Sequence, residues 1–97
     1  LMKTWINRVS RAQSTDDVTE ITRRFVSRVS MTGTGVVPRS CLPPERLDSI
    51  EKLRDYASTL VSFHSRAANT VAVYWIAAYF ATAAVRLAEI LQDTPFV

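Results

Sequence analysis

Residues 67–85 read AANTVAVYWIAAYFATAAV, a run of nineteen residues without a charge. Arg66 and Arg86 flank it. A helix needs about 20 mainly apolar residues to cross the hydrocarbon core of a bilayer. The stretch therefore predicts a single transmembrane helix, and the alternative is a buried helix in a soluble assembly.

The composition of this stretch keeps the soluble alternative open. Eight of the nineteen residues are Ala and none is Leu, so the hydrophobicity is moderate. Tyr74, Trp75 and Tyr79 lie towards the middle, whereas aromatic residues of membrane helices concentrate at the two interfaces. Eleven of the twelve Lys and Arg residues precede the stretch, which favours a cytoplasmic, matrix or stromal position for the N-terminal side.

No Gly or Pro interrupts residues 45–92, which predicts one long helix with its apolar span at 67–85. Such a helix would be about 70 Å long, whereas a compact chain of this size is about 25 Å across. It must therefore project, break or cross a membrane, and the sequence leaves open whether it bends near Arg66. Its early apolar positions form a heptad-like row: Leu47, Ile50, Leu53, Ala57, Leu60 and His64.

Residues 1–30 predict two short, basic amphipathic helices. In the first, Leu1, Trp5, Ile6 and Val9 share one face, and we expect Trp5, Lys3, Arg8 and Arg11 to contact a membrane surface or a partner. In the second, from about Asp16 to Ser30, the apolar row is Val18, Ile21, Phe25 and Val29. The arginines of its later turns, which are interpreted as a solvated face, are Arg23, Arg24 and Arg28.

A linker and a short tail complete the predicted organisation. Residues 31–44 hold both glycines and three of the four prolines, and residues 93–97 form the tail. Gly33 and Gly35 do not make a phosphate-binding fingerprint, because no Lys-Ser or Lys-Thr follows them. The predicted fold class is all-α: two N-terminal helices, an extended linker and one long C-terminal helix with a probable span.

Small residues recur along one side of the long helix. They allow the close approach through which membrane helices associate, so we expect a helix-packing interface at Thr70, Ala77, Ala81, Ala84 and Ala88. Arg86 is expected to pair with Glu89 or to extend outward.

The sequence offers no constellation for catalysis, and we expect no catalytic residue, no metal site and no cofactor. His64 is the single histidine and Cys41 the single cysteine, whereas metal sites and activated nucleophiles need several converging groups. His64 is expected at an interface, and haem or pigment binding through it is a third hypothesis. Cys41 is expected to be an ordinary thiol.

Two functional classes remain. The first is a non-catalytic accessory subunit of an energy-transducing membrane complex, such as the mitochondrial respiratory chain or ATP synthase. It would act in assembly and stability in the mitochondrial inner membrane, or else in the thylakoid membrane. Its partners would be other subunits and lipid, with no small-molecule substrate and no nucleic acid. The second class is a soluble helical coat or scaffold protein whose basic helices would face nucleic acid or an acidic partner.

Overall fold

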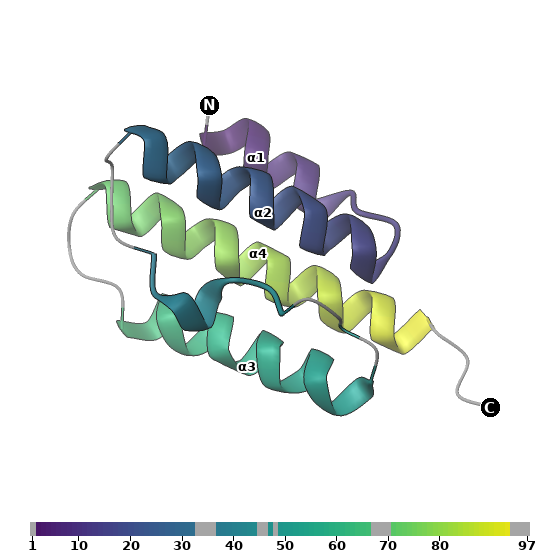
Figure 1. Ribbon diagram of the computed structural model, residues 1–97. Coiled ribbons are helices and arrows are strands. Elements are labelled where there is room, and N and C mark those ends of the chain that lie inside the picture. Colours follow the sequence, from purple (N-terminus) through teal and green to yellow (C-terminus); the bar gives the residue numbers. More distant parts are fainter. Residues whose placement is uncertain (1, 33–36, 45–46, 48, 67–70, 94–97) are drawn as a thin grey trace.

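The computed structural model describes residues 2–32, 37–44, 47, 49–66 and 71–93, and within these ranges the protein is all-α with no strand (Figure 1). The predicted fold class is therefore confirmed. The elements are α1 (Met2–Ser10), α2 (Thr15–Thr32), the short 3-10 helix η1 (Arg39–Cys41), α3 (Ile50–Arg66) and α4 (Val71–Asp93). The predictions for Leu1, Gly33, Gly35 and Thr70 and for residues 67–69 and 94–97 concern positions outside the described residues.

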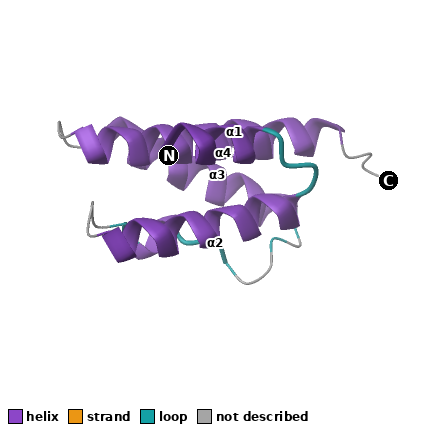
Figure 2. Cartoon of the chain, turned by 90° about the horizontal axis from the view of Figure 1, so that it is seen from above, coloured by secondary structure: helices purple, strands orange, loops and turns teal. Residues whose placement is uncertain are grey.

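Helix α4 is the central element and packs against the other three helices. In Figure 1, α2 and α3 run in the direction opposite to α4, while α1 runs parallel to it. Figure 2, viewed from above, places α1 and α4 in one layer and α2 in a second layer alongside it. The single long helix predicted over residues 45–92 is therefore two helices, α3 and α4, which lie side by side because each buries an apolar side against the other. This answers the question of continuity that the sequence left open.

Serine side chains set the beginnings of two helices. The backbone N–H of Asp17 donates to Ser14 Oγ at 3.2 Å, and the Asp17 carboxylate accepts from the N–H of Gln13 at 3.1 Å. The N–H of Lys52 donates to Ser49 Oγ at 3.2 Å. Such caps satisfy N–H groups that a helix leaves unpaired at its first turn. Helix α3 consequently begins at Ile50, later than the start near residue 45 predicted from sequence.

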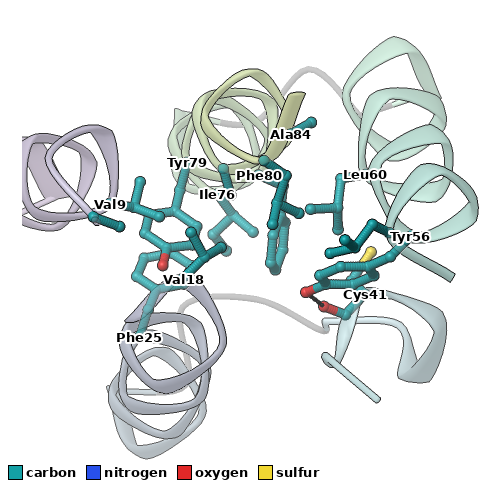
Figure 3. Close-up of a cluster of buried hydrophobic side chains, with 14 of the residues drawn as sticks. Val9, Val18, Phe25, Cys41, Tyr56, Leu60, Ile76, Tyr79, Phe80 and Ala84 are labelled. Atoms are coloured by element: carbon teal, nitrogen blue, oxygen red, sulfur yellow. Dashed lines mark hydrogen bonds between the residues drawn. The ribbon is translucent and has the colours of Figure 1, made fainter. Parts of the chain in front are cut away.

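An aromatic core joins all four helices. The ring of Phe25 from α2 stacks on Tyr79 of α4 with centroids 3.8 Å apart and meets Phe80 edge-on at 5.9 Å. Trp5 from α1 approaches Phe25 at 6.1 Å, and Phe63 from α3 approaches Phe80 at 5.6 Å. Figure 3 shows Phe25, Tyr79 and Phe80 among the surrounding aliphatic side chains. Edge-to-face and offset-stacked ring pairs contribute about 0.5–1.5 kcal/mol each beyond the burial of their area.

Two polar contacts connect α4 to the N-terminal helices. Thr22 Oγ1 and Tyr79 Oη lie 3.1 Å apart in a buried hydrogen bond. Arg86 Nε donates to the carbonyl oxygen of Ala12, just after α1, at 2.6 Å. Arg86 also lies 3.8 Å from Glu89 Oε1, which is the pairing expected from sequence. The arginine that ends the charge-free stretch therefore anchors α4 to the α1–α2 connection.

One helix of the described chain is long and apolar enough to span a membrane. Its qualifying window, Val73–Gln92, has a mean hydropathy of 1.3, and 39% of this window is buried inside the bundle. This property rests only on the length and the composition of the helix. The buried part faces the core, and the rest of the window is half-buried or exposed.

Candidate functional surfaces

A basic groove lies between α1 and α2. It has a volume of about 650 Å³ and is lined by Thr4, Trp5, Arg8, Arg23, Arg24, Ser27 and Arg28. The two helices run antiparallel (Figure 1), so the first turns of α1 lie beside the last turns of α2. This packing brings Arg8 to the three arginines of α2, which are far from it in sequence.

The electrostatics of the groove are one-sided, because no carboxylate lines it. Among the described residues, Arg24 is the one groove arginine with an ion pair: its Nε lies 3.0 Å from Glu20 Oε1. Both side chains are largely exposed. The guanidinium carbon of Arg8 lies 4.9 Å from the centroid of the Trp5 ring, which is a cation–π distance. Arg23 makes a long 3.5 Å contact with the carbonyl oxygen of Pro44. Arginines so placed can bind an anion with several negative charges.

A second surface is the outer face of α4, defined here by Val71, Tyr74, Ala78, Ala81 and Val85. Val71 is 75% exposed, Tyr74 63% and Val85 60%, while the two alanines are half-buried. The opposite side of α4 carries Ile76, Tyr79, Phe80, Ala83 and Leu87, all buried. Because Tyr79 and Phe80 contact Phe25 of α2, the outer face points away from α2. Helix α4 is thus apolar on two opposite sides.

The predicted helix-packing residues divide between the core and the boundary with α3. Ala77 and Ala84 are buried, Ala81 is half-buried, and Ala88 is exposed. Ala84 and Ala88 line a shallow groove of about 470 Å³ whose other wall is Ala57, Ser58, Val61 and Ser62 of α3. Ala77 and Ala84 therefore lie against the rest of the chain, whereas Ala81 belongs to the outer face and the exposed Ala88, seven residues later, lies at the border between that face and the groove.

The predicted contact residues of the first helix also separate by role. Lys3, Arg8 and Arg11 are exposed, whereas Trp5 is half-buried against Phe25. The ring of Trp5 packs on the aromatic core and lies under the Arg8 guanidinium, and its predicted contact with a membrane or partner stays a prediction.

Buried titratable groups gather where η1 meets α3. Tyr56 Oη donates to the carbonyl oxygen of Cys41 at 3.0 Å, as Figure 3 shows. Burial raises the pKa of the Cys41 thiol above its ordinary value of 9.0, and burial likewise raises the pKa of Tyr56. Cys41 is therefore a thiol with little thiolate at neutral pH, and nucleophilic chemistry needs the thiolate.

His64, predicted at the apolar seam of the third helix, is exposed. The half-buried neighbour is Phe63, which contacts Phe80. Over the described ranges, no group of three or more His, Cys, Asp or Glu side chains is placed to hold a metal ion. In the same ranges, every buried side-chain nitrogen or oxygen atom has a hydrogen-bond partner.

Comparison of the chain with protein-family models, curated proteins and solved structures gave no match.

Proposed function

We propose that this chain is a non-catalytic helical subunit of a self-assembling complex, whose copies pair through the outer face of α4. The observation that carries the proposal is the two-sided apolar character of α4: one side is buried in the bundle and the other is exposed. A helix that packs on a single core has one apolar stripe and a polar opposite side. A second apolar side on the surface is typical of a protein contact.

The distribution of side-chain size on the outer face favours a second copy of the chain as its partner. Tyr74 and Ala88 lie at equal separations on either side of Ala81. In an antiparallel pair with its two-fold axis at Ala81, Tyr74 of each copy would lie beside Ala88 of the other. Large side chains would then face small ones, which is how well-packed helix pairs interlock. A two-fold interface requires such complementarity of one surface to itself.

Size-exclusion chromatography with light scattering, in buffer without detergent, tests this proposal. The purified chain is expected to be soluble and to associate as its concentration rises. Ala81→Leu should weaken association about 10-fold, because extra methylene groups at the closest approach cost about 1–3 kcal/mol. Tyr74→Ala should also weaken it, because it removes the largest exposed side chain of the face.

The matched control is Asp16→Asn, on the exposed surface of α2, which should associate as the parent does. Far-UV circular dichroism of each variant separates loss of association from loss of folding. A chain that stays monomeric at several hundred micromolar, or that associates equally well with Ala81→Leu, would overturn the proposal.

A second candidate rests on the window Val73–Gln92, which is apolar enough to span a bilayer. In this candidate the chain is a single-pass accessory subunit of an energy-transducing membrane complex, acting in assembly. The location would be the mitochondrial inner membrane, or otherwise the thylakoid. Helix α4 would have to leave Phe25 and expose its core face to lipid or to other subunits. Retention of the protein in carbonate-washed membranes of its source cells would favour this candidate, and release into the supernatant would favour self-assembly.

A further inference from the structure

We propose that the basic groove between α1 and α2 binds the phosphodiester backbone of a nucleic acid, without sequence preference. This inference concerns a different surface from the outer face of α4 and does not depend on self-assembly. The sequence predicts no nucleic-acid partner for an accessory membrane subunit and interprets the arginines of α2 as a solvated face. The packing of α1 against α2 adds Arg8 to these arginines in one groove.

The groove carries an excess of positive charge. Arg8, Arg23, Arg24 and Arg28 line the groove, and no acidic residue does. Arg24 and Arg28 are four positions apart on one helix, where like charges repel by a few tenths of a kcal/mol. The acidic residues of α2 lie in its first half, and Glu20 alone of them pairs with a groove arginine. A bound polyanion would relieve this repulsion.

The hydrogen-bond donors of the groove are of the kinds that bind phosphate. All four cations are arginines, and a guanidinium group presents paired N–H donors that match two oxygens of a phosphate. The remaining polar residues of the lining are Thr4 and Ser27. Hydroxyl groups such as these are common donors to the phosphate oxygens of nucleic acids. The groove therefore offers phosphate-binding groups on both of its walls.

The lining of the groove favours a nucleic acid over a peptide or a membrane as its ligand. An amphipathic peptide needs apolar pockets for its anchoring side chains, and a membrane surface is bound by apolar side chains that insert beside the cations. The single apolar residue of the lining is Trp5, which is half-buried, covered by Arg8 and packed against Phe25. A phosphate backbone needs no apolar contact, so it fits this lining best.

The charge count sets the expected salt dependence. If each of the four arginines neutralises one phosphate of a duplex, the slope of log K against log salt is about −3.6. Raising the salt concentration from 50 to 200 mM should then weaken binding about 100-fold. Duplexes of unrelated sequence should bind with affinities within a few-fold of one another, because backbone contacts carry no sequence information.

Fluorescence anisotropy with a labelled DNA duplex of arbitrary sequence tests the inference. The double variant Arg23→Gln/Arg28→Gln should bind at least 10-fold more weakly at 50 mM salt and show a smaller salt slope. The matched control is Arg54→Gln/Arg66→Gln, which removes the same charge from exposed positions of α3. It should bind within about 3-fold of the parent. Circular dichroism should show all three proteins equally helical.

Several outcomes would overturn the inference. They are no binding at 50 mM salt, an equal loss of binding in the groove and control variants, and a salt slope that the groove variant leaves unchanged. Competition identifies other anions: displacement of the duplex by 10 mM inorganic phosphate, by polyglutamate or by phosphatidylserine vesicles at equal charge concentration would assign the groove to that anion instead. Ala81→Leu should bind the duplex as the parent does, so failure of self-assembly is distinguishable from failure of this site.

Discussion

Single polar side chains connect the helices of this protein at points that are far apart in sequence. Thr22 bonds to Tyr79, Tyr56 bonds to the carbonyl oxygen of Cys41, and Arg86 bonds to that of Ala12. None of these pairs can be predicted from periodicity, because each depends on which helices become neighbours. The sequence did predict which residues are apolar and buried on α2, where Val18, Phe25 and Val29 are core residues.

Removing either partner of the hydrogen bond between Thr22 and Tyr79 should destabilise the protein, but by different amounts. Thr22→Val should destabilise the protein by about 1–3 kcal/mol, because the buried Tyr79 hydroxyl loses its partner. Tyr79→Phe should cost less, because the Thr22 hydroxyl can turn to a backbone carbonyl of its own helix. Replacing both residues should cost less than the sum of the single changes, by about 0.5–1.5 kcal/mol. Urea unfolding of the four proteins measures this, and strictly additive effects would mean that the two hydroxyl groups do not interact.

The buried phenol of Tyr56 predicts a loss of stability in alkali. Its pKa is higher in the folded protein than the ordinary value of 10.0, so above about pH 10 the unfolded chain releases a proton that the folded chain retains. The free energy of unfolding should therefore be unaffected by this group below pH 10 and fall as the pH rises further. Cys41, with its raised pKa, adds a fall in the same direction from about pH 9.

Tyr56→Phe provides the matched test of this pH dependence. It should cost about 1 kcal/mol at pH 7 through the lost hydrogen bond to Cys41. It should also reduce the decline in stability between pH 9 and pH 11. Urea midpoints at pH 7, 9, 10 and 11 give both quantities, and an unchanged alkaline decline would show that Tyr56 is not its source.

At the scale of the helices, the apolar faces were largely predictable from sequence. Which helices pack against each other, and which residues of α3 face the core, were not. The heptad-like row placed His64 on the buried side of α3, but the buried positions are Leu53, Tyr56 and Leu60, followed by the half-buried Phe63. The predicted row holds Ala57 and His64 where the structure buries the preceding residues, Tyr56 fully and Phe63 in part; the ring of Tyr56 is buried and its hydroxyl donates to Cys41. The reversal between α3 and α4 could not be predicted because no Gly or Pro precedes it. Packing on α4 is what buries the apolar side of α3.

The cap of α2 predicts a measurable contribution of local structure to stability. Ser14→Ala should destabilise the protein by about 1 kcal/mol, because the N–H of Asp17 loses its acceptor in the first turn. Ser58→Ala, at an exposed position in the middle of α3, is the control and should be neutral or slightly stabilising, because Ala has the higher helix propensity. The midpoints of thermal unfolding of the two variants measure this difference. Equal midpoints would show that Ser14 does not stabilise the protein as a cap.

For the molecule as a whole, α4 cannot serve the bundle and a lipid bilayer at the same time. The side of α4 that meets the core stacks Tyr79 on Phe25, and α2 and α3 both carry charged outer surfaces. Such charged helices cannot accompany α4 into hydrocarbon without a large cost in free energy. Phe25 contacts both α1 and α4, so replacing it tests whether α4 packs in the bundle or is free to enter a membrane.

Phe25→Ala should destabilise the folded chain by about 3–5 kcal/mol, because it leaves a cavity among the rings of Trp5, Tyr79 and Phe80. That loss is a large part of the 5–15 kcal/mol that stabilises an ordinary domain, so the variant should unfold at much lower urea or be partly unfolded in buffer. The control, Val85→Ala on the outer face of α4, should change the midpoint by less than about 1 kcal/mol when measured on dilute protein. Far-UV circular dichroism without detergent provides the readout. If Phe25→Ala unfolds at the same urea concentration as the parent, α2 does not pack on α4 in solution, and the membrane-spanning candidate becomes the better account of the apolar stretch.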